Sequence, residues 1–277
     1  MTQAEHVRSI SLDLDSPELA ATYDRVSTRQ FNHGKLLIQD LALRPGERVL
    51  DIGCGTGRLG AHVADLVSPN GHVLGIDPLP LRIDLAAKKN ARFQASVGRA
   101  EDLSAFADTS FDAAYANSVF HWVSDKPRAL REVIRVLRPG GRFGVNSADG
   151  ERPHQSAAIV RAAVLAEGLG DVAAASGFGT NFRVTGNELE QLLTEAGFVD
   201  VRITARTFVD ELSDVDDLIA WSKSSSFGNF LSDVSLSDLP RVKARLAAEL
   251  ETRRSGGKIQ LERYLVFATA RKPRSDA

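Results

Sequence analysis

The sequence predicts an α/β fold in which a parallel sheet is covered by helices on both faces, that is, a doubly wound sheet. Two observations indicate it. Short apolar segments alternate with helical segments from about residue 48 to residue 147, and a glycine-rich turn follows the first of these segments directly. Strands that alternate with helices favour parallel pairing, because each crossover helix returns the chain to the same edge of the sheet.

The elements are expected in the following order. Residues 17–43 carry apolar side chains at helical spacing and end at the turn Arg44-Pro45-Gly46-Glu47. Strands are then predicted at 48–53, 72–77, 92–97, 111–116 and 142–147, and helices at 58–67, 79–90 and 126–137, with a breaker at 138–141.

The pattern is less regular beyond Ser147. Glycine and alanine are scattered between residues 149 and 186, so we expect irregular structure there. A helix at 187–196 and a strand at 198–208 follow, residues 212–254 are mostly helical, and residues 259–270 alternate as a long strand.

The most informative segment runs from Val49 to Gly57, where a buried strand enters a glycine-rich turn before a helix. Gly53, Gly55 and Gly57 permit positive φ values and let a ligand approach the main chain closely. The helix from Arg58 presents unpaired N–H groups at its start. This arrangement is typical of a nucleotide-like ligand.

Two kinds of nucleotide fit the turn. Gly55-x-Gly57-x-x-Gly60, with Asp77 about twenty residues beyond, also matches the dinucleotide fingerprint. Asp51, however, lies two residues before Gly53, where its carboxylate would repel a pyrophosphate. A ligand with an amino group and a sulfonium would be attracted, and S-adenosylmethionine is such a ligand. Residues 50–57 (Leu-Asp-Ile-Gly-Cys-Gly-Thr-Gly) resemble the first motif of the class I S-adenosylmethionine-dependent methyltransferases.

Later segments extend this resemblance. Gly98–Leu103 is similar to the adenine-contacting segment of that family, and residues 115–123 with 137–141 resemble the branch that includes trans-aconitate methyltransferases. The segments Tyr23–Ser27 and Gln30-Phe31 also resemble that branch, whose amino-terminal helices close over the cofactor. The resemblance therefore implies a Rossmann-like class I methyltransferase fold. It implies cofactor contacts from Asp51, Gly53, Cys54, Gly55, Asp77, Pro78, Ala100, Glu101, Asp102, Asn117, Tyr23 and Gln30.

Individual roles follow from the chemistry of these side chains. Asp77, at the end of a strand, can accept hydrogen bonds from the two ribose hydroxyls, or it can cap the helix that starts near Leu79. Ala100 and Glu101 are expected to contact the adenine. Asp102 is the next candidate for this contact, and the alternative for one of the two acids is to cap the short helix that follows.

Catalysis of methyl transfer rests mainly on alignment of the reactants, and a general base is optional. His121 is the candidate base, because it follows the fourth strand near the expected methyl position; the alternative is that His121 and Trp122 only line the pocket. His33 and His154 are weaker candidates. Arg152, Arg161 and Arg183 could bind a substrate carboxylate.

Aromatic residues gather between residues 178 and 230, which we interpret as part of a substrate lid. The expected substrate contacts are Trp122, Phe178, Phe182, Trp221 and Phe227. Gly170, Gly177, Gly179 and Gly228 could act as hinges of the lid.

We therefore expect one catalytic domain over residues 1–277. Its parts are a helical cap at 1–45, a core at 46–148, 187–209 and 258–272, and a lid of helical insertions at 149–186 and 210–257.

Composition narrows the function further. The formal net charge of −2 and the pI of about 6.3 give no global attraction for nucleic acid or an anionic membrane. Residues 1–6 resemble no signal peptide, no apolar run is long enough to span a membrane, and the single cysteine, Cys54, suits a reducing cytoplasm. No metal-ligand spacing is found.

The function expected from the sequence is methyl transfer from S-adenosyl-L-methionine to an oxygen, nitrogen or carbon atom of a small organic molecule, of the kind met in specialised metabolism. S-adenosyl-L-homocysteine would be the product. The alternatives are an NAD(P)-dependent oxidoreductase, a protein or RNA methyltransferase, and a noncatalytic cofactor-binding regulator. Neither the substrate nor the oligomeric state follows from the sequence.

Overall fold

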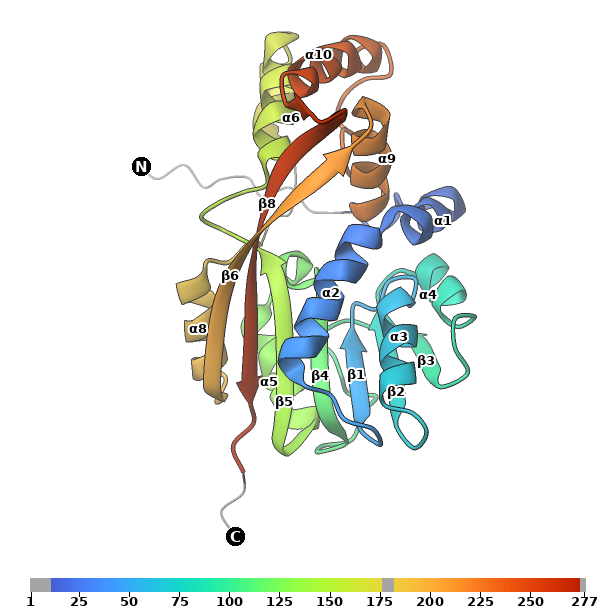
Figure 1. Cartoon of the computed structure of the whole chain (residues 1–277), viewed down its shortest axis with the longest axis vertical. Coiled ribbons are helices and arrows are strands. Elements are labelled where there is room, and N and C mark those ends of the chain that lie inside the picture. The colour runs from blue at the N-terminus through green and yellow to red at the C-terminus, as the bar shows by residue number, and fades with distance from the viewer. Residues whose placement is uncertain (1–10, 176–181, 275–277) are drawn as a thin grey trace. The chain divides into compact units, whose positions relative to one another are not determined.

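The computed structural model describes residues 11–175 and 182–274 (Figure 1). Contacts divide the chain into two compact units. The larger, here called the sheet unit, comprises Ser27–Glu151, Phe182–Arg206 and Leu265–Ala277. The smaller, here called the helical unit, comprises Met1–Val26, Arg152–Asn181 and Thr207–Tyr264, so far as these ranges are described. The predicted division into cap, core and lid of a single domain stays a prediction.

The strands form one sheet in the order β3-β2-β1-β4-β5-β8-β6, and the short β7 pairs with β8. Their bounds are β1 Arg48–Ile52, β2 His72–Asp77, β3 Phe93–Val97, β4 Phe111–Asn117, β5 Leu137–Ala148, β6 Val199–Leu212, β7 Arg254–Ser255 and β8 Lys258–Arg271. Strands β1 to β5 pair in parallel, which confirms the doubly wound sheet. Strand β8 runs antiparallel to β5, a direction that the sequence analysis did not predict.

Helices of the sheet unit cover both faces of the sheet (Figure 1). They are α2 Thr28–Leu41, α3 Arg58–Leu66, α4 Pro80–Ala86, α5 Lys126–Val136 and α8 Gly186–Glu195, with the short 3₁₀ helix η1 Phe120–Trp122. Consecutive residues of β5 show the alternation. Gly144 faces Leu37 of α2, whereas the Phe143 ring stacks on Phe198 in the core that contains Leu130 of α5. Each face therefore buries its own apolar layer.

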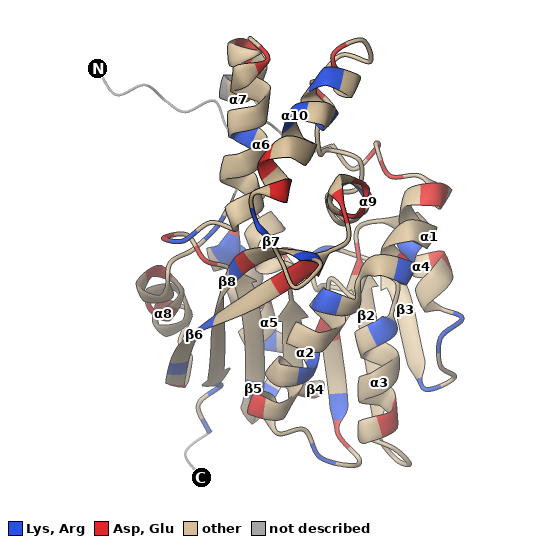
Figure 2. Cartoon of the chain, turned by 45° about the horizontal axis from the view of Figure 1, so that its top comes forward, with Lys and Arg blue, Asp and Glu red and all other residues tan. Residues whose placement is uncertain are grey.

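The helical unit has a separate hydrophobic core. It contains α1 Pro17–Val26, α6 Gln155–Ala166, α7 Gly170–Ala175, α9 Val215–Ser225 and α10 Leu239–Glu251. Strands β6 and β8 contribute residues 207–212 and 258–264 to it. Buried side chains such as Val160 of α6, Leu246 of α10 and Leu261 of β8 make up this core. Figure 2 shows Lys and Arg interspersed with Asp and Glu on the helices and loops of the chain.

Most predicted elements are confirmed within a few residues, and three expectations are corrected. Residues 149–186 are not irregular throughout, because α6 and α7 lie within them; alanine, which makes up five of the twelve residues of α6, is a strong helix former. Helix α4 ends at Ala86, before the turn at Lys88 and Lys89. Residues 138–141, expected between a helix and a strand that begins at 142, belong to β5, which begins at Leu137; the ladder with β4 shifts register around them.

Candidate functional site

The candidate site lies where the order of the strands reverses. From β1 the chain adds β2 and β3 on one side, and it later adds β4 and β5 on the other. Ligands of open α/β sheets bind at the carboxyl ends of the strands next to such a switch point. In this chain those ends lead into the glycine turn after β1, Asp77 at the end of β2, and Asn117 at the end of β4.

The glycine turn has the conformation that the sequence predicts. Gly53, Gly55 and Gly57 have φ values of 73°, 54° and 79°, a region that favours glycine. A Cβ atom on Gly53 would lie 2.2 Å from Cγ2 of Val119, so the main chain passes directly under the segment after β4. The N–H groups of Gly53 and Cys54 both donate to the Ile76 carbonyl, at 2.7 and 2.9 Å, which fixes the turn to β2.

The third glycine of the dinucleotide-like pattern has a packing role. Cβ atoms on Gly57, Gly60 and Gly75 would lie 2.7, 2.4 and 2.7 Å from ring atoms of Phe93. These three glycines therefore form a notch that holds the Phe93 ring between α3 and the sheet. The Gly55-x-Gly57-x-x-Gly60 spacing is thus explained without a pyrophosphate.

Asp77 joins the glycine turn to the start of α4. Its Oδ2 accepts the Gly55 N–H at 2.9 Å, and its Oδ1 accepts the Leu79 N–H at 3.0 Å. Leu79 is the residue before α4, so part of the predicted capping role is present. Pro78 lies between Asp77 and Leu79 in the sequence. Each carboxylate oxygen has a second lone pair, so Asp77 keeps the capacity to accept further hydrogen bonds.

Asp51 is the most unusual group of the site. It is 2% exposed, and its Oδ2 has no hydrogen-bond partner among the described residues. Burial raises the pKa of Asp51 to about 7, the Tyr115 hydroxyl opposes this rise, and the negative charge of Asp77 adds to it. Tyr115 is the residue opposite Asp51 in the β1–β4 register. A cationic group bound at Asp51 would relieve this electrostatic strain.

Cys54 is part of the glycine turn. Its thiol is buried, and its Sγ would be 2.9 Å from a Cβ on Gly75. Burial raises the pKa of this thiol well above its usual range, so it is held as a neutral thiol. The side chain therefore fills space between the turn and β2.

The segment after β3 forms a tight turn. Gly98 N–H donates to the main-chain oxygen of Asp77 at 3.1 Å, which brings this segment to the end of β2. The exposed Asp102 accepts the Ser104 N–H at 3.1 Å, and its hydrogen bonds with Ser104 lower its pKa. Ala100 and Glu101 are half-buried beside it. Asp102 is therefore the acid that caps the turn, and the adenine contact of Glu101 stays a prediction.

Asn117 connects three elements at the end of β4. Its Nδ2 donates to the Gln30 carbonyl of α2 at 3.1 Å, and its Oδ1 accepts from Asn146 of β5 at 2.8 Å. Asn146 also accepts the Ser118 N–H at 2.7 Å. These bonds set the position of the segment that leads to η1.

His121 is buried and held through one ring nitrogen. Its Nδ1 accepts the Ala148 N–H at 3.2 Å and lies 3.4 Å from the Ser147 hydroxyl. An acceptor Nδ1 places the proton of the neutral ring on Nε2. The ring centroid of Trp122 lies 5.4 Å from that of His121, and the His121 carbonyl accepts the Phe182 N–H at 3.2 Å. The structure thus brings three predicted residues together.

Comparisons with known proteins agree with this geometry. Residues 50–145 match a family model described as "Methyltransferase domain". A trans-aconitate 2-methyltransferase of Deinococcus radiodurans is 28% identical over 237 residues, which cover 83% of this chain and 88% of the relative. The YcgJ protein of Bacillus subtilis has a TM-score of 0.58 at 20% identity, covering 88% of this chain and 99% of that one, and shows the fold.

Residues 50–145 therefore form a methyltransferase domain, and the chain has the class I methyltransferase fold. S-adenosylmethionine is the cofactor of this family. An uncharacterised methyltransferase of Mycobacterium tuberculosis is 42% identical over 98 residues, which cover 35% of this chain and 38% of the relative. The chain spans less than half the length of several of the curated relatives that it matches.

The residues of this methyltransferase site fit that cofactor. Oδ2 of the buried Asp51 carboxylate lacks a hydrogen-bond partner among the described residues, as expected for an atom that meets a ligand ammonium. The Gly53 backbone passes within contact distance of Val119, as a close-fitting turn requires.

Several predicted site residues belong to the helical unit or fall outside the described residues. Tyr23 of α1, Trp221 of α9 and Phe227 belong to the helical unit, and Phe178, Gly177 and Gly179 lie outside the described residues. Within the helical unit the Arg263 guanidinium lies 4.5 Å from the Trp221 ring centroid, and Arg263 binds the buried Asp210. The substrate contacts predicted for Trp221 and Phe227 stay predictions, as does the cofactor contact predicted for Tyr23.

The weaker candidates have identifiable local roles. His154 caps α6 and lies 3.2 Å from Asp210. Arg152 stacks on Tyr264, and Arg161 donates to the Ala173 carbonyl at 3.3 Å. Arg183, by contrast, belongs to the sheet unit, where burial lowers its pKa. A Cβ on Gly228 would lie 2.6 Å from the Leu14 carbonyl oxygen, so this glycine permits close packing.

Two further groups near the site were not predicted. Lys126 is buried at the start of α5; its Nζ donates to the Val123 carbonyl at 2.8 Å and lies 5.4 Å from the Phe182 ring centroid. Burial lowers its pKa to about 8. The other group is the pair Glu132 and Arg135, which binds the loop after the adenine-type turn. No sequence motif marks either group, because each depends on tertiary contacts.

Two features are absent from the described residues. No group of three or more His, Cys, Asp or Glu residues is arranged to hold a metal ion among them. None of the helices in the described ranges has the length and apolar character needed to cross a membrane.

Proposed function

We propose that this protein transfers a methyl group from S-adenosyl-L-methionine to an oxygen, nitrogen or carbon atom of a small organic molecule. The observation that carries the proposal is the pair of buried carboxylates, Asp51 and Asp77, at the ends of adjacent parallel strands around a glycine turn. Asp51 has one oxygen, Oδ2, without a hydrogen-bond partner among the described residues, and Asp77 holds the turn in place.

Each carboxylate has a distinct task in this proposal. Asp51 pairs with the ammonium of the methionyl part, and Asp77 accepts hydrogen bonds from the ribose hydroxyls while it holds Gly55 and Leu79. The main chain of Ala100 and the side chain of Glu101 bind the adenine. Gly53, Cys54, Gly55, Pro78, Asn117 and Gln30 shape the surface around these contacts.

The bound cofactor supplies an electrophilic methyl group on a sulfonium. The protein has to hold the acceptor in line with that methyl group and keep water out, and such alignment provides much of the rate. His121, Trp122 and Phe182 form the side of the pocket next to the reacting atoms in this proposal. His121 can act as a base only from Nε2, in the tautomer that gives up the Ala148 bond.

Two observations support a small acceptor. The relative matched over 88% of its length is a trans-aconitate 2-methyltransferase, and other relatives carry the names demethylmenaquinone methyltransferase and arsenite methyltransferase. The formal net charge of −2 does not favour nucleic acid as a substrate. Trp221, Phe227 and Phe178 are our proposed substrate contacts, in addition to Trp122 and Phe182. A cytoplasmic location remains our expectation from the composition.

The first experiment is a calorimetric titration of the purified protein with S-adenosyl-L-homocysteine, with NADH as the comparison ligand. We expect binding of S-adenosyl-L-homocysteine and its loss in Asp51→Asn. Heat of binding with NADH alone would contradict the proposal.

The second experiment tests the substrate class. Release of S-adenosyl-L-homocysteine from S-adenosyl-L-methionine is measured with trans-aconitate and with small acceptors that carry hydroxyl or amine groups. Turnover confined to a protein or RNA fraction would contradict a small acceptor.

A further inference from the structure

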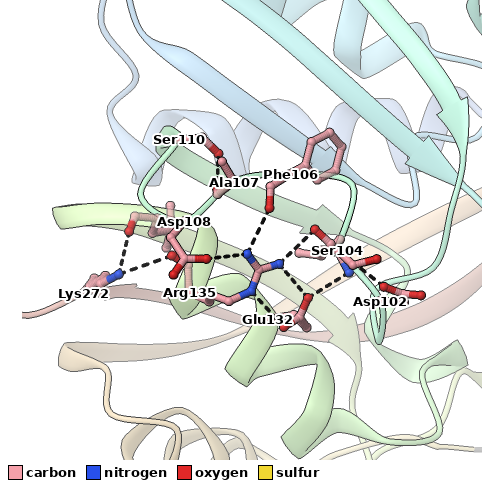
Figure 3. Close-up of polar contacts among 11 residues, drawn as sticks. Asp102, Ser104, Phe106, Ala107, Asp108, Ser110, Glu132, Arg135 and Lys272 are labelled. Atoms are coloured by element: carbon pink, nitrogen blue, oxygen red, sulfur yellow. Dashed lines mark hydrogen bonds and ion pairs between the residues drawn. The ribbon is translucent and has the colours of Figure 1, made fainter.

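One arginine uses its whole guanidinium to hold the loop that follows the adenine-type turn (Figure 3). Arg135 lies in the last turn of α5. Its NH1 donates to the Phe106 carbonyl at 2.9 Å and to Asp108 at 2.7 Å, and its NH2 donates to the Leu103 carbonyl at 2.9 Å. Its Nε and NH2 donate to the two carboxylate oxygens of Glu132 at 3.0 and 2.8 Å. All five N–H donors are therefore engaged.

Glu132 completes this arrangement, one turn earlier on α5. Its Oε2 accepts the Leu103 N–H at 3.0 Å, so Glu132 and Arg135 together bind both main-chain groups of Leu103. Hydrogen bonding to Arg135 lowers the pKa of Glu132, which keeps the carboxylate ionised. Leu103 is fully buried in the core of the sheet unit. Its main chain and its side chain are thus both fixed.

The anchored residue lies directly beside the turn expected to contact adenine. Leu103 is two positions after Glu101. The turn itself is short: Asp102 N–H donates to the Arg99 carbonyl at 3.1 Å, and Asp102 caps Ser104. A turn of this kind has few main-chain bonds of its own, so its position depends on the side chains that hold its end. In this loop those side chains come from α5.

We propose that Arg135, acting through Glu132 and Leu103, is a positioning residue that holds Ala100 and Glu101 at the spacing that selects adenine. The proposal rests on the proposed function, because it concerns the same cofactor site. Arg135 is not among the residues proposed to contact the cofactor or the substrate. Its effect is on the choice of base, and that effect distinguishes positioning from general stabilisation.

The test uses two ligands that differ at positions 6 and 1 of the base, because the 6-oxo form also carries a proton on N1. S-adenosyl-L-homocysteine carries the 6-amino group of adenine, and S-inosyl-L-homocysteine carries a 6-oxo group instead. Calorimetry gives both dissociation constants for the wild type, for Arg135→Met and for the control Arg138→Met. Arg138 also pairs with an aspartate, Asp112, at 2.6 Å, but it lies at the amino-terminal end of β5. Circular dichroism checks that each variant is folded.

We expect Arg135→Met to weaken S-adenosyl-L-homocysteine binding about tenfold while S-inosyl-L-homocysteine binding changes little, so that the preference for adenine falls by a similar factor. Arg138→Met should keep both constants. Equal losses for the two ligands, or unchanged constants, would overturn the inference. A wild type that binds neither ligand would overturn the proposed function and this inference together, which is a separate result from a change in the variant alone.

A second variant covers the case in which Arg135→Met does not fold. Glu132→Gln keeps the size of the side chain and removes the negative charge that Arg135 binds. It should reduce the preference for adenine in the same direction but by a smaller factor. If Glu132→Gln keeps the wild-type preference, the inference is wrong.

Discussion

Asp51 should destabilise the free protein at neutral pH, and removal of its charge should reveal the size of that effect. Burial raises the pKa of this carboxyl from 3.8 to about 7 in the folded state. Between these two values the folded protein holds a proton that the unfolded chain has released, so stability falls as pH rises. Each pKa unit corresponds to about 1.4 kcal/mol, so the ionised Asp51 costs about 4 kcal/mol of unfolding free energy above pH 7.

The perturbation that tests this is Asp51→Asn, which keeps the shape of the side chain. Urea unfolding of both proteins at about pH 5 and pH 8 gives the stability difference at each pH, and the variant should gain about 3 kcal/mol more at the higher pH. Asp200→Asn is the matched control, because that carboxylate is 68% exposed. A difference between Asp51→Asn and wild type that does not change with pH would refute this reasoning.

The same titration should appear in ligand binding. A ligand ammonium needs the ionised carboxylate, so the affinity for S-adenosyl-L-homocysteine should fall as pH drops below about 7, by up to tenfold per pH unit. Calorimetry in buffers of different ionisation enthalpy should detect proton release from Asp51 on binding near pH 6.5. If binding exchanges no protons with the buffer, Asp51 is not the partner of the ammonium.

Three further predictions concern single side chains. Asp77→Ala should weaken S-adenosyl-L-homocysteine binding about tenfold or more, because the ribose acceptor and the bond to Gly55 are both lost; unchanged calorimetric affinity would remove Asp77 from the site. Gly60→Ala should lower the unfolding free energy by about 1–3 kcal/mol, since its Cβ would lie 2.4 Å from the Phe93 ring; wild-type stability in urea would contradict the packing role. His121→Ala should reduce turnover at saturating substrate about a hundredfold if His121 is the base, and near wild-type turnover would leave it a lining residue.

The strands around the site were predictable because local signals mark them. Strand β2 at His72–Asp77 is bounded by a glycine turn and a proline, and the predicted range matches the observed one. Helix α6 was not predicted, because most of its residues are apolar. With so few polar residues, its two faces differ little in polarity. The direction of β8 could not be predicted, because alternation along a strand is the same for parallel and antiparallel pairing.

Site residues that belong to a local sequence motif were predictable, whereas properties that depend on contacts between distant residues were not. Asp51 and Asp77 lie beside the glycine turn, as expected. The rise in the pKa of Asp51, however, follows from burial between neighbouring strands. Likewise, the tautomer of His121 depends on the Ala148 N–H, which is 27 residues away in sequence. Such pairings are set by the fold and leave no local pattern.

The place of β8 in the sheet determines when the sheet can be completed during synthesis of the chain. Strand β8 lies between β5 and β6 although it is the last of the three to leave the ribosome. Until residue 271 has emerged, β5 and β6 each present an unpaired edge, and such edges invite association with other nascent chains. Assistance from chaperones would therefore matter most in the interval between the synthesis of β6 and that of β8.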